Sequence, residues 1–260
     1  MKISTEIESV ITPLGEEKGM EALAKAGFDG WDFTLFPHTL ERADYLTYAR
    51  RMKQLGESLG MVCNQSHAPF PTTNPSIRDL MKRAIEATAE AGGSICVIHP
   101  LHIDTVEANA AFYRELLPFA KDHGVKIATE NIFSKNHSPA ACTTPSHYIS
   151  QLERISDPSF VACLDIGHAE IAGCAVEMIH TLGHHLQALH VHDNDKRKDL
   201  HQLPFTGSID FAPIMQALKE TGYTGWLTLE ADGFLSNLPQ DQVAANVPQL
   251  AAAARGLLQT

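Results

Sequence analysis

Apolar runs in the sequence repeatedly end in residues that could bind a metal ion or move a proton. Six such run ends succeed one another along the chain: Asn64-Gln65-Ser66-His67, Val97-Ile98-His99, Ala128-Thr129-Glu130, Leu164-Asp165-Ile166-Gly167-His168, His190-Val191-His192-Asp193 and Leu229-Glu230-Ala231-Asp232. One polar residue in such a place is commonly a helix cap or a solvated group. Several carboxylates brought to one face are costly to bury unless a cation compensates. The repetition therefore predicts a metal site.

The residue types indicate which ions would fit. The expected ligand set is hard and rich in oxygen: Glu130, Asp165, His192 and Glu230. Such a set suits Mn²⁺, Mg²⁺ or Co²⁺, and Zn²⁺ also fits. His190 and His192 are two apart, so on a strand both side chains point the same way and either could be the ligand; we expect His192. Across a bound ion, one carboxylate can remove a carbon-bound proton while the ion holds the enediolate oxygens.

Strands and helices that alternate along the whole chain must position these residues. Short runs rich in Val, Ile and Leu predict eight strands, several typical of parallel strands covered on both faces: Ile3–Val10, Gly30–Phe36, Met61–Gln65, Ser94–Ile98, Lys126–Glu130, Val161–Asp165, Leu186–His192 and Trp226–Glu230. Apolar residues at spacings of three and four predict eight helices: Glu16–Ala26, Thr39–Leu59, Ser76–Ala91, Val106–Asp122, Pro145–Ile155, Ala169–Leu182, Phe211–Thr221 and Gln240–Leu258.

This alternation indicates either a closed parallel barrel or a doubly wound open sheet. No GxGxxG turn follows the first strand, so the dinucleotide-binding form of the open sheet has no support. We therefore expect one α/β domain, a (β/α)8 TIM barrel over residues 1–260. In such a barrel the chemistry collects where the strands end, and there the six run ends would meet.

Charge and cysteine content bear on partners and compartment. The chain has 20 Lys and Arg against 31 Asp and Glu, and a net charge of −11 disfavours nucleic acid and anionic membranes as partners. Its five cysteines form no CxxC pair, as expected of reduced thiols in a cytoplasmic protein. The N-terminus lacks the apolar run of a signal peptide, and no run approaches the ~18 apolar residues of a membrane span. Nothing in the sequence indicates the oligomeric state.

Three segments resemble the xylose isomerase-like barrels, a family of sugar and sugar-phosphate isomerases and epimerases that includes ketose 3-epimerases and endonuclease IV. These segments are Leu164–Ala169, Leu189–Asp195 and Gly225–Glu230. The resemblance implies that one divalent ion is bound by Glu130, Asp165, His192 and Glu230. It also implies that Glu130 and Glu230 form the acid–base pair, and that His168 contacts the substrate.

The same resemblance widens the candidate site. Endonuclease IV binds three zinc ions, and its further ligands look similar to His67, His99, His168, Asp199 and His201 here. Sugar isomerase-like members also carry several of these residues, so His67, His99 and His168 could bind substrate instead. Arg197 and Lys198 fall near an arginine that contacts substrate oxygen in ketose 3-epimerases, and a cationic side chain there would recognise a hydroxyl or phosphate. Trp31, Phe33, Phe36 and Phe70 could stack on a sugar or pack in the core.

We expect isomerase or epimerase chemistry on a small carbohydrate, in which one of Glu130 and Glu230 removes a proton beside a carbonyl and the other returns one. Three alternatives stay open: a carbohydrate lyase or dehydratase of the same fold, an endonuclease IV-like zinc nuclease, and a barrel that binds without catalysis. The acidic charge and the lack of basic-aromatic runs count against the nuclease. One ion per chain would favour the isomerase, and three zinc ions the nuclease.

Overall fold

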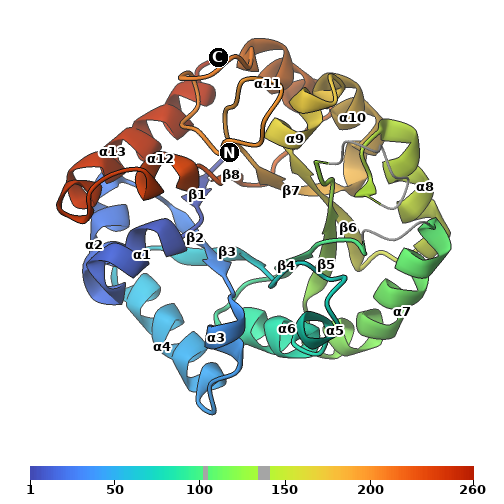
Figure 1. Ribbon diagram of the computed structural model, residues 1–260, viewed down its shortest axis with the longest axis horizontal. Helices are drawn as coiled ribbons and strands as arrows, with labels where there is room; N and C mark the ends of the chain where they lie inside the picture. Colours follow the sequence, from blue (N-terminus) through green and yellow to red (C-terminus); the bar gives the residue numbers. More distant parts are fainter. Residues whose placement is uncertain (102–104, 134–140) are drawn as a thin grey trace.

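A closed ring of parallel strands forms the inner wall of the molecule, and helices surround it (Figure 1). The computed structural model describes residues 1–101, 105–133 and 141–260. Strands β2 to β7 lie in one parallel sheet in chain order, and β1 pairs with β8. The bridges Glu6–Asp32 and Val191–Leu229 join these two groups. The expected α/β barrel is therefore confirmed.

The strands of the barrel are short. They are β1 Ile3–Thr5, β2 Gly30–Thr34, β3 Val62–His67, β4 Ile95–Ile98, β5 Lys126–Glu130, β6 Phe160–Asp165, β7 Leu186–His190 and β8 Leu227–Leu229. The helices that the structure describes are α1 Glu8–Leu14, α2 Glu16–Ala26, α3 Pro37–Leu40, α4 Tyr45–Ser58, α5 Pro75–Arg78, α6 Met81–Glu90, α7 Val106–Asp122, α8 Pro145–Ile155, α9 Ile166–Ile171, α10 Ala175–Leu182, α11 Phe211–Glu220, α12 Asp232–Ser236 and α13 Gln240–Leu257, with a 3₁₀ turn η2 at Gly183–His185.

Some boundaries differ from those expected. The first strand stops at Thr5, because the Glu6 carboxylate accepts a hydrogen bond from the Ser9 amide at 3.1 Å and the chain turns into α1. The expected helices 39–59, 76–91 and 169–182 are each divided in two. Between α9 and α10 the division lies at Gly173, whose φ of 71° is left-handed and ends the first piece.

Alternation along the strands decides what faces the barrel axis. A small interior cluster fills the lower part of the barrel: Val97, Ala128, Val161, Cys163 and Ala188. A strand returns to the same face every second residue. The next inward positions on β4 to β7 are therefore the polar residues at the strand ends: His99, Glu130, Asp165 and His190. The interior cluster thus closes the barrel below its mouth, and the polar strand-end residues lie in the next layer above it.

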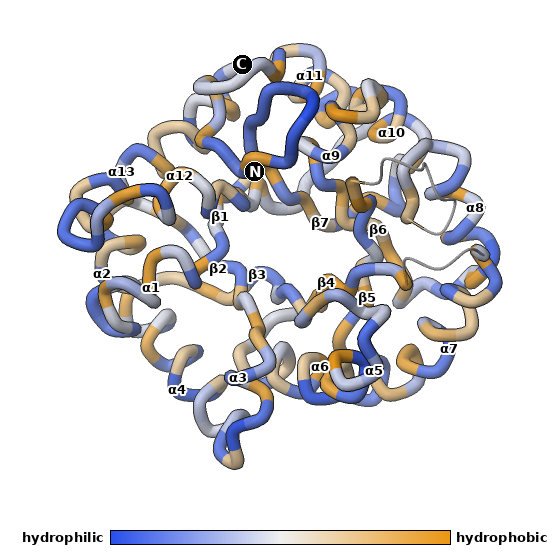
Figure 2. The backbone as a smooth tube through the Cα atoms, viewed as in Figure 1, coloured by the Kyte–Doolittle hydropathy of each residue, from blue (hydrophilic) through white to orange (hydrophobic). Residues whose placement is uncertain are grey.

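The helices and loops around the barrel are mixed in hydropathy (Figure 2). The loop that follows β7 is a mostly hydrophilic segment at the rim of the barrel. It is held by paired backbone hydrogen bonds between Asp193 and Gln202, of 2.8 and 2.9 Å. Among the residues described, no helix has both the length and the apolar content that a membrane crossing requires.

Candidate metal centre

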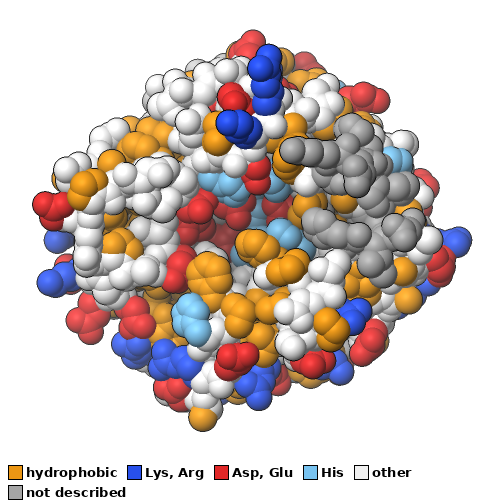
Figure 3. All heavy atoms as spheres, in the orientation of Figure 1, with side chains coloured by type: hydrophobic (Ala, Val, Ile, Leu, Met, Phe, Trp, Pro, Cys, Tyr) orange, Lys and Arg blue, Asp and Glu red, His pale blue; other side chains and the backbone are white. Residues whose placement is uncertain are grey.

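The carboxyl ends of the strands surround a cavity of about 920 Å³. Figure 3 shows its floor as a gathering of acidic and histidine side chains within a rim that includes hydrophobic ones. Seven of the expected site residues line it: His67, His99, Glu130, His168, Asp199, His201 and Glu230. The strand-end residues are thus brought together, and three clusters can be distinguished among them.

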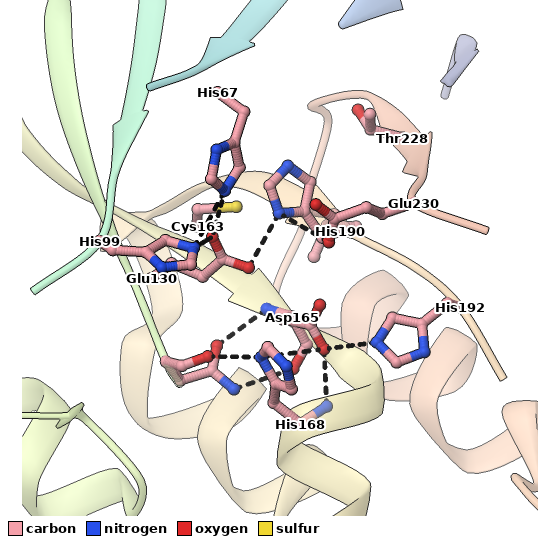
Figure 4. Close-up of polar contacts among 12 residues, drawn as sticks. His67, His99, Glu130, Cys163, Asp165, His168, His190, His192, Thr228 and Glu230 are labelled. Carbon is pink, nitrogen blue, oxygen red and sulfur yellow. Dashed lines mark hydrogen bonds and ion pairs between the residues drawn. The ribbon is translucent and has the colours of Figure 1, made fainter. Parts of the chain in front are cut away.

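The first cluster consists of His67, His99 and Glu130 (Figure 4). The two Nε2 atoms are 3.0 Å apart, and they lie 3.3 Å (His67) and 3.2 Å (His99) from Glu130 Oε2. Ligand atoms about 2.0–2.1 Å from a tetrahedral ion are roughly 3.3 Å from one another, which matches this spacing. His67 Nδ1 lies 2.8 Å from the Ala68 carbonyl oxygen, which can only accept. Nδ1 therefore carries the hydrogen and Nε2 offers its lone pair to the cluster.

The second cluster consists of Glu130, Asp165, His190 and Glu230. One ligand atom from each lies within 4.8 Å of the others. His190 Nδ1 is 2.9 Å from Glu130 Oε1 and 3.5 Å from Glu230 Oε2. Glu130 Oε2 and Asp165 Oδ2 are buried without a hydrogen-bond donor among the described residues. Buried carboxylate oxygens in this state need a cation, so the cluster fits a divalent metal ion.

The third cluster consists of His168, His192, Asp199 and His201. Asp199 is its centre: Oδ2 lies 3.0 Å from His168 Nε2, and Oδ1 lies 3.2 Å from His201 Nε2. His168 Nδ1 faces the Asn131 carbonyl at 2.9 Å and His201 Nδ1 faces the Glu230 carbonyl at 2.9 Å, so both rings turn Nε2 toward Asp199. These residues could hold a further ion.

His192, which we expected to join Glu130, Asp165 and Glu230, lies with the third cluster in the structure, and His190 takes the place beside those carboxylates. Strand β7 ends at His190, and His192 stands two residues, roughly 6.5 Å, further along the direction of the strand. Its Nε2 is 3.5 Å from Asp199 Oδ1 and 3.2 Å from Asp165 Oδ1, so it borders the second cluster without replacing His190. Gly167 makes room for it, because a Cβ there would lie 2.0 Å from His192 Cε1.

Opposite charges in the clusters shift each other's proton affinity. Burial by itself raises the pKa of Glu130, but His190, His67 and His99 outweigh burial and hold that pKa well below its ordinary value. Burial lowers the pKa of His99 to about 4, so this imidazole is neutral and free to bind a cation. Burial also opposes protonation of His168, yet Asp165 and Asp199 raise its pKa to about 10. Protons thus partly neutralise the carboxylates where no cation does.

Other expected site residues lie elsewhere. Arg197 and Lys198 are exposed and do not appear in the cavity lining that the described residues form, although their backbone amides bind Asp195 Oδ1 at 2.9 and 2.7 Å. Trp31 and Phe33 are fully buried in the core, because alternation on β2 turns them outward to the helices. Phe36 and Phe70 do line the cavity.

Sequence reasoning missed three buried polar residues at or below the cavity: Glu6, Asp32 and Gln65. Glu6 lines the cavity next to β1, and burial together with nearby Asp232 raises its pKa to about 8. Asp32 had a readable signal, since it is a carboxylate in the middle of the apolar run Gly30-Trp31-Asp32-Phe33. A charge in a buried strand is rarely accidental.

The chain belongs to the xylose isomerase-like TIM barrel family, whose model matches residues 20–254. It is 27% identical over 242 residues to an uncharacterized protein of Methanocaldococcus jannaschii, covering 85% of this chain and 80% of that one. It is 25% identical over 231 residues to the inosose dehydratase of Clostridium botulinum, covering 81% and 69%. The family resemblance drawn from the three sequence segments is thus confirmed.

Solved structures share the fold over the whole chain. A D-tagatose 3-epimerase-like protein superposes with a TM-score of 0.77 at 23% identity, covering 100% of this chain and 98% of that one. A D-psicose 3-epimerase studied with D-fructose gives 0.78 at 15% identity, covering 100% of both. An IolI protein with a bound zinc atom gives 0.77 at 17% identity, covering 98% and 96%.

Proposed function

We propose that this protein is a divalent-metal-dependent isomerase or epimerase of a small carbohydrate. The observation that carries the proposal is the second cluster, in which three carboxylates and one imidazole from β5, β6, β7 and the end of β8 converge, two of them, Glu130 and Glu230, lining the cavity. The ligand chemistry favours Mn²⁺, Mg²⁺ or Co²⁺ there, while the histidine-rich first and third clusters suit Zn²⁺. A cytoplasmic setting and a sugar partner, free or phosphorylated, form part of the same proposal.

The two glutamates have different surroundings. Both oxygens of Glu130 face imidazoles, Oε1 that of His190 and Oε2 those of His67 and His99. Glu230 is more accessible, with 18% of its side chain exposed against 1% for Glu130. When bound, a divalent ion would polarise a substrate carbonyl and stabilise charge on its oxygen. We assign Glu230 to remove the proton beside that carbonyl and Glu130 to return one, with His168 holding a substrate oxygen.

Proton transfer through the two glutamates should exchange the carbon-bound hydrogen with solvent. Turnover of a ketose in deuterium oxide by the manganese-loaded protein should place deuterium at the carbon next to the carbonyl, and mass spectrometry or proton NMR would detect it. Heat-denatured protein with the same metal is the control for exchange by free ions. Product that carries no deuterium would remove the two-glutamate scheme, and product that has lost water would show the dehydratase reaction instead.

The presence of all three clusters favours one second candidate, a zinc-dependent phosphoester hydrolase similar to endonuclease IV. Several adjacent cations can stabilise both the attacking and the leaving oxygen of a phosphoryl group. The net charge of −11 opposes binding to DNA, so we expect little nicking of an abasic-site duplex by the zinc-loaded protein. Catalytic nicking, together with three zinc ions per chain, would reverse the ranking of the two functions.

A further inference from the structure

His190 is oriented differently from four other histidines of the site. His67, His168, His192 and His201 each turn Nδ1 toward a main-chain carbonyl oxygen and Nε2 toward a cluster. His190 does the opposite, since its Nδ1 faces Glu130 and Glu230 while its other ring nitrogen, Nε2, points away from them (Figure 4). A ligand imidazole needs an acceptor for the hydrogen on its outer nitrogen. For His190 that acceptor must come from the barrel interior.

Asp32 on β2 occupies this place. Its Oδ2 lies 3.2 Å from His190 Nε2, and both side chains are only 1% exposed. Asp32 faces the interior because its neighbours Trp31 and Phe33 pack outward. A register shift between β2 and β3 after Trp31 aligns Asp32 with Gln65, so that Gln65 also faces inward. Asp32 thus contacts His190 on the side of the ring opposite the second cluster.

Gln65 holds Asp32 in turn. Its Nε2 donates to Asp32 Oδ2 at 2.8 Å. Its Oε1 accepts from Asn64 Nδ2 at 3.1 Å and from Thr228 Oγ1 at 3.3 Å, and these bonds fix which end of the amide faces Asp32. The hydrogen-bonded chain continues to Ser4, whose hydroxyl donates to Thr228 Oγ1 at 2.8 Å. Side chains from β1, β2, β3, β7 and β8 are therefore connected across the floor of the cavity.

Packing alone does not account for a carboxylate at this place. The other oxygen of Asp32, Oδ1, is buried and has no hydrogen-bond partner among the described residues. A buried ionic group that is only partly satisfied is costly, and an apolar residue of similar size would stabilise a barrel floor better. The cost is understandable if the negative charge of Asp32 acts on His190.

We propose that Asp32 is a positioning residue for the second cluster. It accepts the Nε2 hydrogen of His190 and so holds Nδ1 toward Glu130 and Glu230, where a cation can replace the Nδ1 hydrogen. Gln65 fixes Asp32 for this role. The inference rests on the proposed metal site, but the hydrogen position on His190 belongs to the protein itself and can be observed without metal.

The first measurement locates the ring hydrogens of His190 in metal-free protein labelled with ¹⁵N-histidine. Long-range proton–nitrogen correlations should show a hydrogen on Nε2, which Asp32 accepts, beside the one on Nδ1 that Glu130 accepts in the absence of a cation. In Asp32→Asn and Asp32→Ala the Nε2 hydrogen should be lost while Nδ1 keeps its own, with the larger effect in Asp32→Ala. Ser4→Ala removes a hydroxyl from the same buried chain without touching His190, so this control should leave both ring hydrogens unchanged.

The second measurement is metal affinity by competition with a chelating dye, using Mn²⁺ and Zn²⁺. Loss of an outer carboxylate typically weakens metal binding about 10–100-fold, and we expect this for the second cluster in both Asp32 variants. Metal binding by the third cluster should not change in the Asp32 variants, and Ser4→Ala should bind metal as tightly as the wild type. If Asp32→Ala unfolds, Asp32→Asn still tests the idea, because it keeps the shape and removes the charge.

Two results would overturn the inference: a wild-type His190 with no hydrogen on Nε2, or Asp32 variants with unchanged ring hydrogens and affinity. The first would mean that Gln65, whose Nε2 is 3.0 Å from His190 Nε2, donates to the ring instead. The second would mean that Asp32 does not set the orientation of the ring. Wild-type protein that takes up neither ion would contradict the proposed function, while the location of the ring hydrogens would still decide the role of Asp32.

Discussion

Replacing Glu130 with glutamine should remove the metal bound by two clusters at once. Glu130 is shared, because Oε2 lies within 3.3 Å of His67 and His99 while Oε1 is 2.9 Å from His190. A neutral amide is a poor ligand for a hard cation and cannot move a proton as a carboxylate does. We expect Glu130→Gln to lose the ions of the first and second clusters and to lower turnover by at least about 10²–10⁴-fold.

Elemental analysis of protein purified without chelator would measure this loss, with turnover assayed on the same samples. Glu107→Gln is a matched control, since Glu107 is an exposed glutamate at the start of α7 that pairs with Arg154. It should keep the wild-type metal content and rate. A Glu130→Gln protein that retains its full metal content would show that Glu130 is not a shared ligand.

Variants of His190 and His192 should have different effects although the two residues are almost adjacent. His190→Ala removes the only imidazole of the second cluster. This variant should therefore lose the ion of the second cluster, and its turnover should fall by at least about 10²-fold. His192→Ala leaves the second cluster complete and removes one of the four residues of the third. It should weaken only the third ion and affect turnover far less.

Metal content and turnover of the two variants, measured side by side with circular dichroism as a check on folding, would decide the assignment. The reverse pattern, in which His192→Ala loses the ion needed for turnover and His190→Ala keeps it, would restore the ligand set expected from the sequence. Equal losses in both variants would show that the second and third clusters bind metal only together.

Much of the site could be predicted from the sequence, because it depends on local pattern. Glu130, Asp165 and Glu230 follow runs whose alternation turns them to the same side as Ala128, Cys163 and Thr228 below them. Parallel strands in a closed barrel bring such ends to one mouth whatever the loops do. The fold, the position of the site and its acidic, histidine-rich character therefore follow from periodicity and residue type.

The tertiary structure decided which of these residues act together. Their grouping depends on the level of each residue in the barrel and on the pairing of neighbouring strands, and no local sequence pattern fixes either. His190 and His192 have the same orientation on a strand, and only the level at which β7 meets β6 and β8 assigns them to different clusters. Asp32 and Gln65 meet His190 only because β2 and β3 shift in register. Asp199 and His201 reach the site because the loop folds back through the pairing of Asp193 with Gln202. The sequence determined which chemical groups face the cavity, and three-dimensional packing determined which of them act together, because contacts between distant strands are set by the whole barrel.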